Sequence, residues 1–229
     1  MRDIKDIARY VGLSLIAKGL TVSPLKLQKL LYYVQSWYMV FNGRQNTLFA
    51  QAPQAWVNGP VYPEIYYQYR DKVSNMCDHL TAKDFDTEDV NATLAELAMK
   101  LQLTADETEL LDSIVMLYGS KSQNGLIFLT HAEQPWVEAR EGLAPYQRSE
   151  KEISLDTMHD YYKARHERFH LSTIFRPVPR TESLGEIKGS RGNTIAPVLI
   201  VYGFNPLLGV SFCDDTSTTS SPFATACCC

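Results

Sequence analysis

Residues 23–41, SPLKLQKLLYYVQSWYMVF, have the pattern of a long helix and set the class of the fold. Ser23 is a favoured N-cap residue, and Pro24 suits the first helical position because its backbone angle is already helical. Asn42-Gly43 follows and can end the helix. Apolar residues recur every three or four positions and form one stripe: Leu27, Leu30, Leu31, Val34, Tyr38 and Phe41. The stretch therefore predicts a helix with one apolar face.

Comparable signals predict further helices on both sides of this one. Their approximate bounds are 3–18, 63–73, 90–101, 105–118, 122–131 and 155–168, with a short helix or turn from about 135. Pro63 opens one helix, and a capping box over residues 104–107 precedes another. Residues 48–57 are predicted to be an extended segment, and Asn58-Gly59-Pro60 strongly favours a turn. The predicted fold is mainly α (α+β): a compact helical domain of about six to seven helices with one short extended element.

The composition is that of an ordinary globular protein, with 229 residues, 45% hydrophobic, 21% charged and a net charge of -4. This size fits one large domain, or a medium domain with an appendage. The charge balance does not favour a broad phosphate-binding surface, so nucleic acid is not an expected partner. No apolar run reaches the ~20 residues of a spanning helix, and the charged N-terminus lacks a signal peptide's apolar stretch. We therefore expect a cytoplasmic protein without a membrane partner.

The C-terminal part of the chain differs from the rest in its periodicity and composition. Helical periodicity fails beyond His170, and residues 214–221 are a low-complexity run of Ser, Thr and Asp. The adjacent Cys227, Cys228 and Cys229 match the spacing of neither a zinc site nor a prenylation box. We predict a domain over residues 1–169 and an irregular, poorly ordered tail over residues 170–229.

The sequence lacks the familiar motifs of catalysis, phosphate binding and metal binding. There is no Walker lysine, no GxSxG elbow and no HExxH. His166 and His170 are four residues apart, which gives at most two metal ligands without an acidic helper. His131 has no nucleophile or acid partner at a recognisable spacing. We therefore predict no catalytic residue, no metal and no cofactor.

One segment keeps DNA binding open as an alternative. Residues 4–14, IKDIARYVGLS, resemble the opening of a LacI-type helix-turn-helix. The helix that would then read the DNA is Leu15-Ile16-Ala17-Lys18, which Gly19 ends. Such a helix is short and apolar for a major groove, so the resemblance is weak.

Aromatic residues gather in one part of the chain. The chain has 13 Tyr, 9 Phe and 3 Trp residues, and 11 of these aromatic residues lie in residues 31–69. One helix cannot bury all its faces against a small domain, and Tyr and Trp often carry the binding energy of protein interfaces. A bulky core and a binding face are therefore both open interpretations.

A second stripe on the helix at 23–41 is a candidate for the binding face. Lys26, Lys29 and Tyr33 follow one another at three- and four-residue steps, away from the apolar stripe. The corner after the extended segment contains two prolines and a glycine, and it could display Asn58 or Tyr62 rigidly. We predict that these five residues contact a partner protein on one surface.

Three blocks of residues resemble the Panacea domain, also described as the SocA-like antitoxin or phage-associated protein family. The first block is LKLQKLLYY at 25–33 with Trp37, and the second is AWVNGPVYPEIY at 55–66. The third consists of Thr130-His131 and Pro135-Trp136 with Arg140. The order and approximate spacing match over about residues 3–165.

We assign a structural role to eight residues of these blocks: Trp37, Trp56, Gly59, Pro60, Pro63, His131, Trp136 and Arg140. Trp56 lies on the extended segment, where an alternating side chain can face the helices. Arg140 follows Trp136 by four residues, so its guanidinium is expected over the indole.

The resemblance implies a mostly helical bacterial domain that neutralises a cognate toxin by direct binding. One branch of the family is described as an adaptor that delivers its toxin to a cytoplasmic protease, and members often lie beside a toxin gene or in prophages. We therefore predict an antitoxin of a toxin–antitoxin system that is not an enzyme. The alternatives are a DNA-binding repressor of its own operon, and a prophage-encoded accessory protein or small enzyme of unknown reaction that would use His131.

Overall fold

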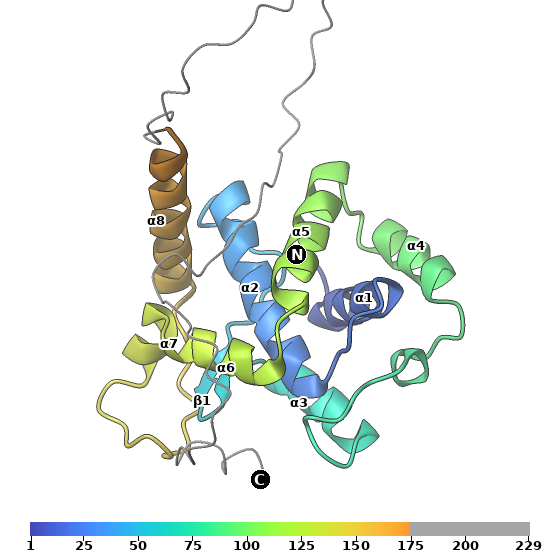
Figure 1. Cartoon of the computed structure of the whole chain (residues 1–229), viewed down its shortest axis with the longest axis horizontal. Helices are drawn as coiled ribbons and strands as arrows, with labels where there is room; N and C mark the ends of the chain where they lie inside the picture. Colours follow the sequence, from blue (N-terminus) through green and yellow to red (C-terminus); the bar gives the residue numbers. More distant parts are fainter. Residues whose placement is uncertain (175–229) are drawn as a thin grey trace, which may run out of the picture. The chain divides into compact units, whose positions relative to one another are not determined.

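The computed structural model describes residues 1–174, with side chains as far as residue 168, and Met1–Thr173 form one compact unit. This part of the chain contains eight α-helices, two single-turn 3-10 helices and one two-stranded sheet (Figure 1). The elements in order are α1 (Ile4–Ala17), α2 (Pro24–Asn42), β1 (Gln54–Trp56), β2 (Gly59–Val61), α3 (Pro63–Tyr69), η1 (Arg70–Lys72), η2 (Ala82–Phe85), α4 (Val90–Lys100), α5 (Ala105–Gly119), α6 (Gln123–His131), α7 (Gln134–Ala139) and α8 (Leu155–Ile174). The predicted mainly α fold is confirmed, with eight helices where about six to seven were expected.

The helices begin where the local sequence signals predicted. The Ser23 hydroxyl accepts a hydrogen bond from the Lys26 backbone N–H at 3.2 Å, and Pro24 is the first residue of α2. Thr104 and Glu107 form the capping box of α5, and Pro63 opens α3. These contacts satisfy backbone donors that a helix N-terminus otherwise leaves without a partner.

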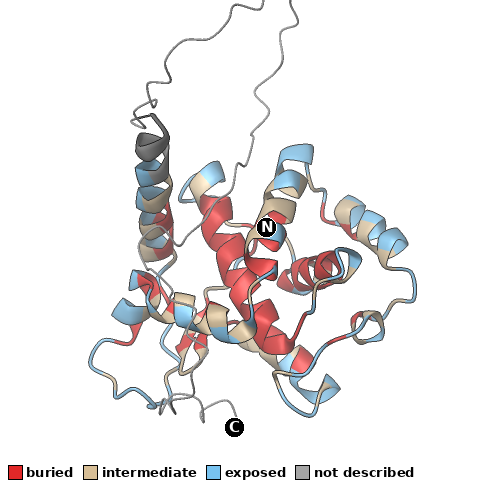
Figure 2. Cartoon of the chain, in the orientation of Figure 1, coloured by how far each residue is buried: buried red, intermediate tan, exposed pale blue. Residues whose placement is uncertain are grey.

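Helix α2 runs through the middle of the fold. Figure 2 shows it buried along most of its length, and each residue from 24 to 39 is buried. It packs against α1, α3, α5, α6 and β2. The prediction of one apolar face and one solvated face is therefore wrong for this helix, because other elements cover it on several sides.

The predicted extended segment at 48–57 contains only β1, and β2 begins at Gly59, within the predicted turn, so the two strands form a hairpin. β1 and β2 pair antiparallel, with Trp56 opposite Gly59 and residues 57 and 58 in the turn. Gly59 has a backbone φ of +96°, which residues with a side chain rarely adopt. Residues 151–153 run along the other edge of β1, where the Ala55 N–H donates to the Lys151 carbonyl at 2.8 Å.

Helix α1 is one uninterrupted helix over Ile4–Ala17. Gly12, where a helix-turn-helix would have its turn, is helical and buried, and a Cβ there would lie only 2.3 Å from the Phe85 ring. This glycine therefore allows η2 to pack closely on α1. The arrangement contradicts the LacI-type helix-turn-helix that residues 4–14 suggested, because no turn separates two helices there.

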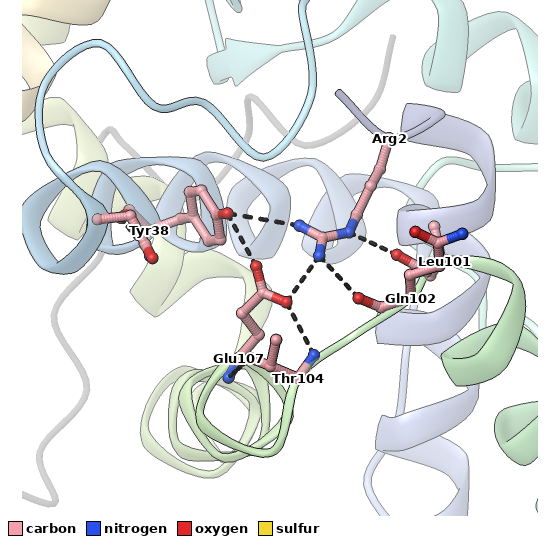
Figure 3. Close-up of polar contacts among 7 residues, drawn as sticks. Arg2, Tyr38, Leu101, Gln102, Thr104 and Glu107 are labelled. Carbon is pink, nitrogen blue, oxygen red and sulfur yellow. Dashed lines mark hydrogen bonds and ion pairs between the residues drawn. The ribbon is translucent and has the colours of Figure 1, made fainter.

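The N-terminus is joined to the core by Arg2 (Figure 3). Its guanidinium donates to the carbonyls of Leu101 at 2.7 Å and Gln102 at 3.1 Å, and it pairs with Glu107 at 2.6 Å. The Tyr38 hydroxyl of α2 donates to the other oxygen of Glu107 at 2.9 Å. Arg2 thereby connects the first residues of the chain to α2 and to the turn between α4 and α5.

Helix α8 extends to Ile174, a few residues beyond the predicted end of the last helix. The predicted poorly ordered tail and its Cys227, Cys228 and Cys229 lie outside the described residues, apart from the end of α8. The division at residue 169 therefore stays a prediction. Within residues 1–174, no helix combines the length and the apolarity that crossing a membrane requires.

Candidate partner-binding surface

The three residues of the predicted binding stripe on α2 are buried. Lys26, Lys29 and Tyr33 have relative exposures of 5%, 0% and 0%. The Lys26 amine donates to the carbonyl of Gly119 at the end of α5, and the Tyr33 ring stacks on Tyr118 of α5 with centroids 3.8 Å apart. The expectation of an exposed stripe is therefore wrong, because α5 covers the side of α2 that carries Lys26 and Tyr33.

Lys29 holds the hairpin against α2. Its amine donates to the Pro60 carbonyl at 3.0 Å, and burial lowers the pKa of Lys29 to about 7. A Cβ on Gly59 would lie 2.8 Å from both Lys29 Cε and Thr130 Oγ1. The glycine is therefore needed both for its positive φ and for the close approach of α2 and α6 to β2.

The corner after the hairpin does not display Tyr62. This residue is fully buried, its ring meets the Phe49 ring edge-on at 5.3 Å, and its N–H donates to Gln28 Oε1 at 2.8 Å. Asn58 lies in the turn and is half-buried. Of the five residues predicted to contact a partner, Asn58 is the one that the fold leaves partly exposed.

The α6–α7 block of the sequence resemblance positions the hairpin from its other side. Trp136 Nε1 donates to the Trp56 carbonyl at 3.0 Å, and Arg140 Nη1 donates to the Ala55 carbonyl at 2.9 Å. The His131 ring stacks on Trp136 at 4.1 Å. Arg140 lies over the same indole at 5.2 Å from its centroid, which confirms the predicted cation–π pair.

Burial, together with the nearby charges of Lys29 and Arg140, lowers the pKa of His131 to about 4. Its imidazole is therefore neutral at neutral pH and packs as an aromatic ring. Trp37 donates from its indole to the Tyr118 hydroxyl at 3.1 Å, and Pro63 starts α3 directly after the corner. The residues of the three sequence blocks thus contact one another and fix the hairpin between α2 and α6–α7.

A buried carboxylate next to this motif was not predicted from the sequence. Glu133, between α6 and α7, is 4% exposed and accepts hydrogen bonds from the hydroxyls of Tyr162 at 2.7 Å and Tyr33 at 3.4 Å. Burial raises the pKa of Glu133 to about 7, although these hydroxyls and the charge of Arg165 act in the opposite direction. The sequence places Glu133 two residues after His131, but its partners on α2 and α8 are distant in the chain.

Five partly exposed rings from α6, α7, β1 and α3 form two contacting sets, and the hydrogen bond from the Trp136 indole to the Trp56 carbonyl joins the two sets. We call this group the aromatic surface: Trp56, Tyr66, Tyr67, His131 and Trp136. The Trp56 ring contacts Tyr66 at 4.9 Å, and Tyr66 contacts Tyr67 at 5.4 Å. Tyr67 is 58% exposed, and Arg70 lies over its ring at 5.1 Å.

The exposed rings of the aromatic surface have the chemistry of protein–protein contacts. His131, with a lowered pKa, is a half-buried ring of the aromatic surface, and Lys29 and Glu133, whose pKa values are also strongly shifted, are buried inside the fold. The aromatic surface, in contrast, combines large apolar rings with polar edges, which is the chemistry of interface hot spots. Among residues 1–168, no group of three or more His, Cys, Asp and Glu side chains could hold a metal ion.

Comparison with known proteins identifies a related family. Searches against curated proteins and against solved structures gave no match. One family model matches, over slightly less than half of the chain. The matched stretch contains the hairpin, most of α2 and all five residues of the aromatic surface. Residues 27–137 match the family described as "Antitoxin SocA-like, Panacea domain", which confirms the resemblance predicted from the sequence.

Proposed function

We propose that this chain is a cytoplasmic antitoxin that neutralises a protein toxin by binding it directly, without catalysis. The observation that carries the proposal is the match of residues 27–137 to an antitoxin-like domain. The neutralising contact is assigned to the aromatic surface, in place of the stripe of Lys26, Lys29 and Tyr33 that is buried in the fold.

The physical support for this surface is its rigidity together with its exposed rings. The Trp136 indole donates to the Trp56 carbonyl, and the Trp56 indole donates to Gln54 Oε1, so the positions of both rings are set before a partner arrives. A preorganised aromatic side chain loses little conformational entropy on binding and removes a large apolar area from water. Asn58, in the adjoining turn, can add a polar contact at the edge of this surface.

Co-expression in bacteria with the product of each open reading frame adjacent to this gene, as a candidate toxin, tests the proposal. The double variant Tyr66→Ala and Tyr67→Ala should lose growth rescue and co-purification with the toxin, while circular dichroism and melting remain near wild type. The matched control is Met99→Ala with Met116→Ala, because these residues are 74% and 57% exposed on α4 and α5. The control should rescue growth fully.

The result also distinguishes the modes of neutralisation. Simple occlusion leaves the amount of toxin unchanged, whereas delivery to a cytoplasmic protease lowers it in cells that contain that protease. A folded double variant that rescues growth as well as wild type would exclude the aromatic surface as the neutralising face. A wild-type chain that neither binds nor neutralises a candidate toxin would contradict the antitoxin function for that pair.

A further inference from the structure

Helix α8 covers an aromatic face of α2. The Tyr162 ring meets Trp37 at 5.2 Å and Tyr33 at 6.1 Å, and His166 meets Phe41 at 5.3 Å. Met158 and Tyr162 are fully buried. In Figure 1, α8 lies beside α2 at the side of the fold remote from α1 and α4.

Toward α7 and toward solvent, the described contacts of α8 are polar. Between α7 and α8 there is an open pocket of about 300 Å³, lined in part by Glu138, Tyr161 and Arg168. The Thr157 hydroxyl donates to Glu138 across this pocket at 3.3 Å. Arg44 pairs with Asp156 and Asp160 on the outside, where such exposed ion pairs add little stability. An exposed stretch at residues 144–148 separates α7 from α8 along the chain.

The buried end of this interface is a polar contact. Tyr162 on α8 donates to the Glu133 carboxylate at 2.7 Å, and both residues are excluded from water. The titratable and charged groups around Glu133 come from three helices: Tyr32 and Tyr33 of α2, Tyr118 of α5, and Tyr161, Tyr162 and Arg165 of α8. Arg165 is the one cation in this set, and its Nε is buried without a hydrogen-bond partner.

We propose that α8 is a latch that separates from α2 and from the α6–α7 junction when Glu133 loses its proton. With α8 in place, the ionised carboxylate is held out of water, with one nearby cation and tyrosine hydroxyls to offset the loss of hydration. With α8 displaced, the same carboxylate is hydrated, and Tyr33 and Trp37 are uncovered. Ionisation therefore favours the open arrangement.

The direction of the pH dependence follows from the raised pKa of Glu133. The pKa of Glu133 is about 7 in the closed arrangement, against 4.5 for a hydrated glutamate. A raised pKa means that the acid stabilises closure fully below about pH 4.5, and that this contribution is lost as the pH rises through about 7. Between about pH 6 and about pH 8, the equilibrium constant for opening should increase about tenfold.

Hydrogen exchange of the full-length chain measures this opening. Exchange of the α8 amides, corrected for the intrinsic pH dependence of exchange, should accelerate about tenfold from about pH 6 to about pH 8 relative to the α2 amides of the same sample. Glu133→Gln keeps a hydrogen-bond acceptor for Tyr162 but cannot ionise, so its α8 exchange should be independent of pH. Glu141→Gln, at an exposed position, is the matched control and should behave as wild type.

Two results would overturn the latch. The first is a wild-type chain whose α8 opens only together with α2, or whose corrected exchange does not change over this range. The second is a folded Glu133→Gln chain that keeps the full pH dependence. If the Gln variant does not fold, a wild-type chain whose corrected exchange does not change over this range still overturns the latch.

Discussion

Replacing Lys29 with Met should change how the stability of the protein depends on pH. Lys29 is fully buried on α2, and its amine donates one hydrogen bond, to the Pro60 carbonyl. Met has a similar length and no charge, so Lys29→Met removes the ionisable group while filling most of the same space. The absolute stability is a poor readout, because the variant gains from losing a buried amine and loses from leaving the Pro60 carbonyl without its donor.

The magnitude follows from the two protonation states. Burial lowers the pKa of Lys29 from 10.5 to about 7. The unfolded chain therefore binds more protons than the folded chain between these values, and the free energy of unfolding rises with pH. The contribution is fully present above about pH 10.5 and is lost as the pH falls through about 7. Between about pH 7 and about pH 9 this group alone should raise the free energy of unfolding by about 2 kcal/mol.

Urea denaturation at about pH 7 and about pH 9 measures this difference for wild type and variant. Other groups that titrate in this range are present in both proteins, so they cancel when the two changes are subtracted. Lys163→Met, at an exposed position of α8, controls for the loss of one positive charge and should follow wild type. If wild type and Lys29→Met change in parallel, the amine is protonated and hydrated in the folded protein, and its assigned role is wrong.

Two further substitutions test the contacts that hold the fold together. Gly59→Ala places a Cβ 2.8 Å from Lys29 Cε, at a residue whose φ is +96°. The free energy of unfolding should therefore fall by about 1–3 kcal/mol. An unchanged midpoint of urea denaturation would contradict the close approach. Arg2→Met removes the donor that the Leu101 and Gln102 carbonyls and the Glu107 carboxylate share. The variant should have a lower melting temperature and a free energy of unfolding lower by about 2 kcal/mol. Hydrogen exchange in the turn between α4 and α5 should be faster. Exchange that changes elsewhere but not in that turn would show that Arg2 does not anchor it.

The sequence predicted the helices because their starts are local. An N-cap hydroxyl such as that of Ser23, or a capping box such as Thr104 with Glu107, acts within four residues along the chain. The local sequence therefore contains the information that determines where these helices begin. The cation–π contact of Arg140 with Trp136 was predictable for the same reason, since one helical turn separates them.

The exposure of side chains was not predictable in this way. Periodicity gives the most apolar side of a helix, but it does not tell how many other elements cover the remaining sides. The two lysines at 26 and 29 resembled a solvated face, yet each amine finds a backbone carbonyl from a segment far along the chain. The burial of Glu133 was not predicted because its hydrogen-bond partners, Tyr33 and Tyr162, are brought together only by the tertiary fold.

The small sheet has a consequence for how a partner can be recognised. One edge of β1 is paired with β2, and residues 151–153 run along the other. β2 is itself buried, and Lys29 of α2 already donates to its Pro60 carbonyl. Within the described chain, this hairpin therefore presents no long open edge to which another protein could add a strand. A partner that reaches the hairpin would have to bind through side chains, so its selectivity would depend on shape and ring contacts more than on backbone pairing.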